Sequence, residues 1–208
     1  TDRCQNCPWE CRVTSKQRLP RARLKCELAR LYSDRVPREQ LELLSDDPAC
    51  GHMHSMNTRT GLDQLIAEDF GRLKGKRIAL LCHAASVASD LRHITQVCRD
   101  LNVNVVQCFG PEHGIWADAQ DMIAVDGDHR EQLTGAPVRS LYGADEVSLS
   151  PRIEDFDGVD VLLIDLQDVG ARYYTYIYTA ALAARVAAQA DVPVLLLDRP
   201  NPIGGTVE

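Results

Sequence analysis

Several patterns that would assign this sequence to a familiar class of protein are missing. No apolar run approaches the roughly 20 residues of a membrane-spanning helix, so no membrane span is expected. No G-x-G-x-x-G follows the first apolar run, where residues 83–86 read HAAS, and this argues against a dinucleotide site. The absence of H-E-x-x-H ranks a metal-dependent hydrolase built on His83 and His113 lowest among the candidate functions. No signal peptide is visible, so a cytoplasmic protein is expected, and a periplasmic or secreted one stays open.

The composition is that of an ordinary globular protein with an uneven distribution of charge. The 208 residues are 45% hydrophobic and 25% charged, with a net charge of −7. The first 38 residues nevertheless carry ten Lys and Arg against four Asp and Glu. The sequence thus predicts a small basic module at residues 1–56, with helices at 21–34 and 38–44, followed by an acidic domain at residues 57–208. The acidic surface argues against nucleic-acid binding by that domain.

Five of the eight cysteines lie in the basic module, and their spacing suggests a metal site. Cys4, Cys7 and Cys11 follow one another at intervals of three and four residues, with Cys26 and Cys50 downstream. This arrangement favours a zinc ion or an iron–sulfur cluster held by Cys4, Cys7, Cys11 and Cys26. Disulfides and free thiols are the alternatives. A mainly helical module of this size needs a metal or a docking surface in order to fold.

Four short apolar runs, at residues 77–82, 104–109, 160–165 and 193–198, are predicted to be strands. Each is nearly continuous in apolar residues rather than alternating, which is typical of parallel strands that are covered on both faces. Helical patterns lie between them at residues 89–101 and 175–190, the second ending before a proline. Alternating strands and helices predict a three-layer α/β domain with a mostly parallel sheet.

Polar residues gather after the carboxyl ends of these runs, which is the edge where open α/β sheets bind ligands. His83 follows the first run, and the pair Glu112 and His113 follows the second. The candidates at the ends of the third and fourth runs are Asp165, Gln167, Asp168, Arg172, Tyr173, Tyr174, Asp198, Arg199 and Asn201. Ordinary structural roles are the alternative, because aspartates cap turns, a histidine can be a hydrogen-bonded wall residue and tyrosines pack in cores.

The turn GPEHG at residues 110–114 is the most informative motif in this set. It presents a carboxyl group beside an imidazole directly after a buried strand, which is typical of acid/base chemistry. Burial in such a turn would favour the protonated form of Glu112 and suit it to donate a proton. Gln120 lies in a following loop that is placed either to fold over the site or to remain plain surface.

Five segments of the chain, in this order, resemble one family of glycoside hydrolases. They are GPEHG (110–114), AQDMI (119–123), SLYG (140–143), DLQDVGARYYTYIYT (165–179) and LDRPNPIGG (197–205). Over about residues 61–208 the chain resembles the exo-β-N-acetylmuramidase family, formerly a domain of unknown function. Members of that family release terminal N-acetylmuramic acid from peptidoglycan fragments. The resemblance implies a bacterial hydrolase of cell wall recycling, a Rossmann-like N-terminal domain and an active site in the cleft between this domain and a smaller second one.

The resemblance also implies roles for individual residues. Glu112 is expected to protonate the glycosidic oxygen, with His113 and Asp168 as further catalytic residues. The residues expected to bind the amino-sugar or muropeptide substrate are His83, Gln120, Arg172, Tyr174, Asp198, Arg199 and Asn201. Either Arg172 or Arg199 is expected to hold the lactyl carboxylate of the sugar. Asp168 and Asp165 are the available second carboxylates, and retaining, inverting and substrate-assisted mechanisms all stay open. No cofactor is implied for the α/β domain.

A second function stands beside this one. The sequence stops soon after PNPIGG, so the second domain of the family is absent from it and the expected cleft would be half open. A partner chain or a second copy of this chain would then complete the cleft. The alternative is therefore a non-catalytic sugar-binding or regulatory module, with the Cys-rich segment contacting a partner.

Overall fold

A mostly parallel sheet forms the centre of the protein. The computed structural model describes residues 41–44, 59–117 and 129–203. Across these residues seven strands lie in the order β1-β7-β6-β2-β3-β5-β4. Their bounds are β1 Leu41–Leu44, β2 Ile78–Cys82, β3 Val105–Gly110, β4 His129–Arg130, β5 Pro137–Ser140, β6 Val161–Asp165 and β7 Val194–Leu197. Only the β4–β5 pair, at one edge, is antiparallel. The predicted α/β fold with a mostly parallel sheet is confirmed.

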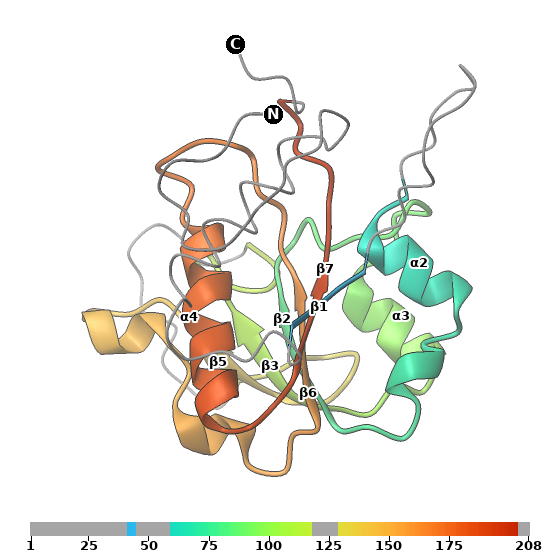
Figure 1. Cartoon of the computed structure of the whole chain (residues 1–208), viewed down its shortest axis with the longest axis horizontal. Helices are drawn as coiled ribbons and strands as arrows, with labels where there is room; N and C mark the ends of the chain where they lie inside the picture. The colour runs from blue at the N-terminus through green and yellow to red at the C-terminus, as the bar shows by residue number, and fades with distance from the viewer. Residues whose placement is uncertain (1–40, 45–58, 118–128, 204–208) are drawn as a thin grey trace, which may run out of the picture.

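Helices cover both faces of this sheet and complete the three predicted layers. Figure 1 shows α4 (Tyr176–Gln189) on one face, with α2 (Gly61–Ala67) and α3 (Ile94–Asp100) together on the other. Short 3-10 turns η2, η3 and η4 occupy Gly71–Leu73, Glu146–Leu149 and Ile153–Phe156. None of the helices that the structure describes is both long and apolar enough to cross a membrane.

The central strands are apolar throughout because alternate residues enter two separate cores. In β2, Leu80 and Cys82 join the core formed with α2 and α3, whereas Ala79 and Leu81 join the core formed with α4. Strands β6 and β7 divide their side chains in the same way. Every residue of β2, β6 and β7 is buried. The continuous apolar runs therefore reflect a sheet covered on both faces, as expected for parallel strands.

An irregularity in β3 sets the direction of the residues that follow it. Ile78 and Ala79 are consecutive in β2, but their partners Val105 and Gln107 are two apart in β3. One extra residue in β3 reverses the alternation beyond that point. Val105 consequently packs in the core with α3, while Phe109 packs in the core with α4. Without this bulge, the turn after β3 would leave the sheet with the opposite orientation.

The helix predicted at residues 89–101 is shorter than its apolar pattern. It begins at Ile94, because the His93 side chain accepts a hydrogen bond from the Thr95 amide and caps the first turn. The preceding segment instead forms a bridge between Val87 and His93. Leu91, an apolar residue within the predicted range, lies outside the helix and is 80% exposed. The local capping group thus outweighs the apolar periodicity before it.

The helix predicted at residues 38–44 is wrong over its last four residues. Leu41–Leu44 form strand β1, in parallel register with β7. The reason is tertiary, since the edge of β7 offers backbone donors and acceptors to any segment that can lie beside it. The rest of residues 1–56 lies outside the described residues, including Cys4, Cys7, Cys11 and Cys26. The metal site and the division into two domains therefore stay predictions.

Candidate active site

A buried ion pair joins the ends of β6 and β7. Asp165 is completely buried, and its partner Arg199 has a side chain that is 6% exposed. Nε and Nη2 of Arg199 donate to the two carboxylate oxygens of Asp165 at 2.5 and 2.8 Å. Nη2 also donates to the carbonyl of Val87 at 3.0 Å, which ties in the loop after β2. Burial raises the pKa of Asp165, and the hydrogen bonds and charge of Arg199 oppose that shift.

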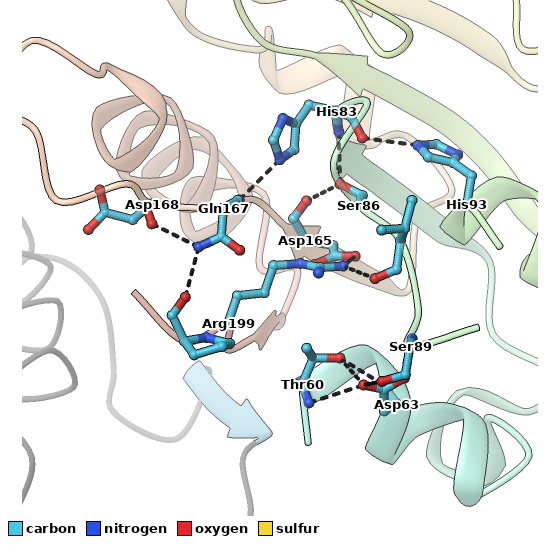
Figure 2. A network of polar contacts seen from close by, with 12 residues as sticks. Thr60, Asp63, His83, Ser86, Ser89, His93, Asp165, Gln167, Asp168 and Arg199 are labelled. Carbon is cyan, nitrogen blue, oxygen red and sulfur yellow. Dashed lines mark hydrogen bonds and ion pairs between the residues drawn. The ribbon is translucent and has the colours of Figure 1, made fainter. Parts of the chain in front are cut away.

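The loop after β2 is tied to the same place by a short chain of hydrogen bonds. The amide of His83 donates to Ser86 Oγ at 2.9 Å, and Ser86 Oγ donates to the Asp165 carbonyl at 2.5 Å. The His83 Nε2 atom accepts a hydrogen bond from the backbone amide of Gln167 at 3.1 Å. His83 is only 5% exposed, so it forms a wall behind the loops. Figure 2 shows this network linking the ends of β2, β6 and β7.

His83 is held in its neutral form. Burial, followed by the electrostatic effects of Arg199 and His93, lowers the pKa of His83 to about 4. A neutral ring whose Nε2 accepts from Gln167 must carry its proton on Nδ1. His83 therefore serves as a hydrogen-bond acceptor at neutral pH, which suits a residue that positions the loop after β6.

His93 extends the network toward an exposed aromatic ring. Its Nε2 donates to the His83 carbonyl at 3.0 Å, while Nδ1 accepts from the Thr95 amide at 3.3 Å. The ring of Trp116 lies 4.3 Å from the His93 ring, at an angle of 37°, and Trp116 is 43% exposed. Neither residue stood out in the sequence, because a single histidine in a helical pattern and a tryptophan in a loop carry no spacing signal.

Glu112 and His113 form a tight turn at the end of β3. The amide of Gly114 donates to the Pro111 carbonyl at 2.9 Å. His113 and Gly114 both have left-handed backbone angles, with φ of 70° and 79°. A Cβ atom on Gly110 would lie 3.1 Å from the backbone nitrogen of Ile115, so any larger residue at this position would crowd the turn.

The start of α4 contacts this turn directly. Oε2 of the half-buried Glu112 accepts a hydrogen bond from Thr175 Oγ1 at 3.3 Å. The backbone carbonyl of Glu112 accepts another from the hydroxyl of Tyr176 at 3.0 Å. Tyr176 is 6% exposed, and its ring meets that of His83 edge-on at a centroid distance of 4.8 Å. The ring of Tyr176 is thus packed in the interior, while its hydroxyl reaches the backbone of a candidate catalytic residue.

The loops after β6 and β7 are joined by two side-chain amides. Gln167 Nε2 donates to the carbonyls of Asp168 and Pro200 at 2.8 and 2.9 Å. Asn201 Nδ2 donates to Asp168 Oδ2 at 3.3 Å, and the Gly170 amide donates to Oδ1 at 3.0 Å. The structure thus brings Asp168 and Asn201 together, with the Asp168 carboxylate half-buried at the edge of the sheet.

The remaining candidate residues have different surroundings. Arg172 is exposed and forms no hydrogen bond or ion pair with any residue that the structure describes. Tyr174 is half-buried, with its ring 4.5 Å from that of Tyr176. The carbonyl of Asp198 accepts a hydrogen bond from the Gly61 amide at 2.7 Å, which attaches α2 to the end of β7. Gln120 lies outside the described residues.

No metal site accompanies this network within the described part of the chain, where no three His, Cys, Asp or Glu side chains are grouped to bind an ion. Cys82, Cys98 and Cys108 are buried free thiols, and burial raises the pKa of each. All three belong to the core between the sheet and helices α2 and α3.

Loss of the buried cation should be far more damaging than loss of a surface cation. Arg199→Gln leaves the Asp165 carboxylate buried and unpaired, so we expect it to lower the free energy of unfolding by about 3–5 kcal/mol. The matched control is Arg77→Gln, because Arg77 pairs with Asp160 through side chains that are 51% and 37% exposed. This control should have little effect. Urea denaturation at neutral pH measures both, and similar losses in the two variants would contradict the role given to the buried pair.

The neutral state of His83 predicts a pH dependence of stability. Between its ordinary pKa of 6.5 and the folded value of about 4, the unfolded chain binds a proton that the folded chain does not. Stability contributed by neutral His83 is therefore lost as pH falls through this window. Between pH 7 and pH 5 the free energy of unfolding of the wild type should fall. In His83→Gln this fall should be smaller by about 2 kcal/mol. Urea denaturation at both pH values tests this, and parallel losses in the two proteins would refute it.

Comparisons with known proteins identify the family of this chain. A family model described as the N-terminal part of the exo-beta-N-acetylmuramidase NamZ matches residues 78–208. The peptidoglycan beta-N-acetylmuramidase NamZ of Bacillus subtilis (strain 168) is 42% identical over 148 residues, which cover 71% of this chain and 35% of the relative.

Two crystal structures of DUF1343 family proteins from Bacteroides fragilis NCTC 9343 are also similar. The first is 37% identical with a TM-score of 0.63, and the match covers 72% of this chain and 36% of the other. The second is 34% identical with a TM-score of 0.50, covering 69% and 35%. The chain spans about a third of the length of these relatives. Since the family model covers more than half of its residues, the chain belongs to the NamZ exo-β-N-acetylmuramidase family and corresponds to the N-terminal part of that family.

Proposed function

We propose that this chain acts in the hydrolysis of terminal N-acetylmuramic acid from peptidoglycan fragments, with Glu112 as the general acid. The observation that carries the proposal is the position of Glu112. It lies on the turn after β3, at the edge where the polar ends of four strands meet, and the N-cap and first residue of α4 hold it there. The chain around it is 42% identical to a protein named as a peptidoglycan β-N-acetylmuramidase.

The chemistry requires a proton donor and a second carboxylate. As the glycosidic bond breaks, the leaving oxygen must gain a proton, and a half-buried carboxyl group such as Glu112 can supply it. Asp168 is proposed as the second carboxylate, because its side chain is half-buried and is oriented by Asn201 and Gly170. Asp165 is a poorer candidate, since both of its oxygens are bound by Arg199 in a fully buried pair. His113, the next residue in the turn, is proposed to assist proton transfer.

The two arginines considered for the lactyl carboxylate differ in their availability. The guanidinium of Arg199 is engaged by Asp165 and by the carbonyl of Val87. Arg172 is exposed, without a partner among the described residues, and follows the Asp168 loop by a few positions. We therefore assign the lactyl carboxylate to Arg172, which can bind a carboxylate through two parallel hydrogen bonds. The other residues proposed to line the sugar are His83, Gln120, Tyr174, Asp198, Arg199 and Asn201.

Removal of the proton donor gives the direct test. Glu112→Gln keeps the size of the side chain but cannot donate a carboxylic proton, so kcat should fall about 10²–10⁴-fold on a β-N-acetylmuramide whose leaving group needs protonation. The control is Glu146→Gln, an exposed glutamate in η3. Both variants should unfold at the wild-type temperature.

Turnover by Glu112→Gln within about threefold of the wild type would reject the assignment of the acid, given the size expected for general acid catalysis. Sugar binding measured by calorimetry, without turnover by the wild-type chain, would instead support the sugar-binding module as the function.

The role of Arg172 is tested by substrate preference. In the same assay, Arg172→Gln should lower kcat/KM for the muramide about tenfold or more, because a charge-assisted contact is lost. The corresponding glucosaminide lacks the lactyl carboxylate, so its kcat/KM should change little. An equal loss of kcat/KM for both sugars would show that Arg172 does not bind the lactyl carboxylate.

A further inference from the structure

We propose that Thr175, the N-cap of α4, and Tyr176, its first residue, position Glu112 for proton transfer. Neither residue was assigned a functional role by its sequence pattern. Both contact Glu112, one through the carboxylate and the other through the backbone. The inference rests on the proposed function in so far as Glu112 is the acid, but the contacts themselves are independent of that assignment.

Tyr176 connects three of the loops that form the site. Its hydroxyl donates to the Glu112 carbonyl at 3.0 Å, and its ring packs against His83 at 4.8 Å and Tyr174 at 4.5 Å. The residue is 6% exposed, and burial raises its pKa, so the hydroxyl keeps its proton and remains a donor. The ring is fixed by packing, and the hydroxyl therefore holds the turn at one position.

The turn needs such support because its backbone is unusual. His113 is a non-glycine residue with a φ of 70°, and Gly114 follows with 79°. Backbone of this kind persists where its surroundings fix it. The internal bond from the Gly114 amide to the Pro111 carbonyl closes the turn, and the Tyr176 hydroxyl attaches the turn to the helix.

Thr175 acts on the carboxylate itself. It stands at the N-cap of α4, where a threonine hydroxyl ordinarily accepts a hydrogen bond from the first helical turn. Here the side chain makes no capping hydrogen bond, and Oγ1 lies 3.3 Å from Oε2 of Glu112. The backbone of Thr175 is helical, with φ of −85° and ψ of −2°, rather than extended as in a side-chain cap. Its hydroxyl is therefore not used by the helix and is available to Glu112.

The kinetic test removes each hydroxyl with little change in shape. Tyr176→Phe and Thr175→Val should each lower kcat about tenfold while KM stays within about twofold, because the acid is misplaced but the sugar pocket is kept. Thr175→Ser retains the hydroxyl, so its kcat should stay close to that of the wild type. The matched control is Tyr178→Phe on the same helix, where the residue is 47% exposed, and its kcat should equal that of the wild type. Equal falls of kcat in the test and control variants would overturn the proposal.

Hydrogen exchange tests the same contact without any need for turnover. Loss of the Tyr176 hydroxyl should speed exchange of the Gly114 amide about tenfold, in line with the usual worth of one hydrogen bond. Amides in β2 should be unaffected, as should the Gly114 amide in Tyr178→Phe. Unchanged Gly114 exchange in Tyr176→Phe would overturn the proposal whether or not the wild type hydrolyses substrate. Faster exchange in a protein without turnover would support the contact between Tyr176 and the Glu112 turn. It would count against the proposed function alone.

Discussion

The buried pair of Asp165 and Arg199 is the interaction on which the arrangement of the site depends. Moving a carboxylate and a guanidinium out of water is costly, and it is offset only when both groups are hydrogen-bonded in good geometry. The fold supplies that geometry, because β6 and β7 are parallel neighbours whose ends meet at one edge. The guanidinium also reaches the carbonyl of Val87, so the loop after β2 joins the pair. Three loops from separate parts of the sequence are thereby fixed to one buried point.

The network divides the polar residues of this edge into two groups. The first group is buried and forms its hydrogen bonds within the group or with the backbone; its members are Asp165, Arg199 and His83. Glu112 and Asp168 are half-buried, with carboxylates held by only one or two neighbours. The first group forms a rigid base, and the second is presented at the edge of the sheet. This division suits acid/base catalysis, in which reacting groups must be oriented by others that do not themselves react.

The opposite side of the site depends on α4 and on the bulge in β3. The extra residue in β3 turns Phe109 toward the core with α4, and the chain then leaves the sheet at Gly110. Glu112 consequently meets the start of α4, where Tyr176 and Thr175 contact it. Packing of the helix against the sheet and placement of the carboxyl group are thus parts of one arrangement.

Much of the fold follows from local pattern, whereas the roles of the polar residues do not. The four main strands and helix α4 were predictable, since strands covered on both faces leave continuous apolar runs and a proline closes the helix. Strand β1 was not, because its pairing depends on the free edge of β7. The late start of α3 depends on His93 as a cap rather than on apolar spacing.

The sequence by itself determined the layered α/β architecture, the edge that carries the polar residues and the family, because these depend on periodicity and on motifs that are contiguous in the chain. It could not distinguish Asp165 from Asp168, or Arg199 from Arg172, since members of each pair lie in similar contexts at the ends of strands. Only the tertiary structure separated them. Burial and partners depend on which loops meet in space, and one aspartate meets an arginine in the interior while the other lies half-buried beside an asparagine.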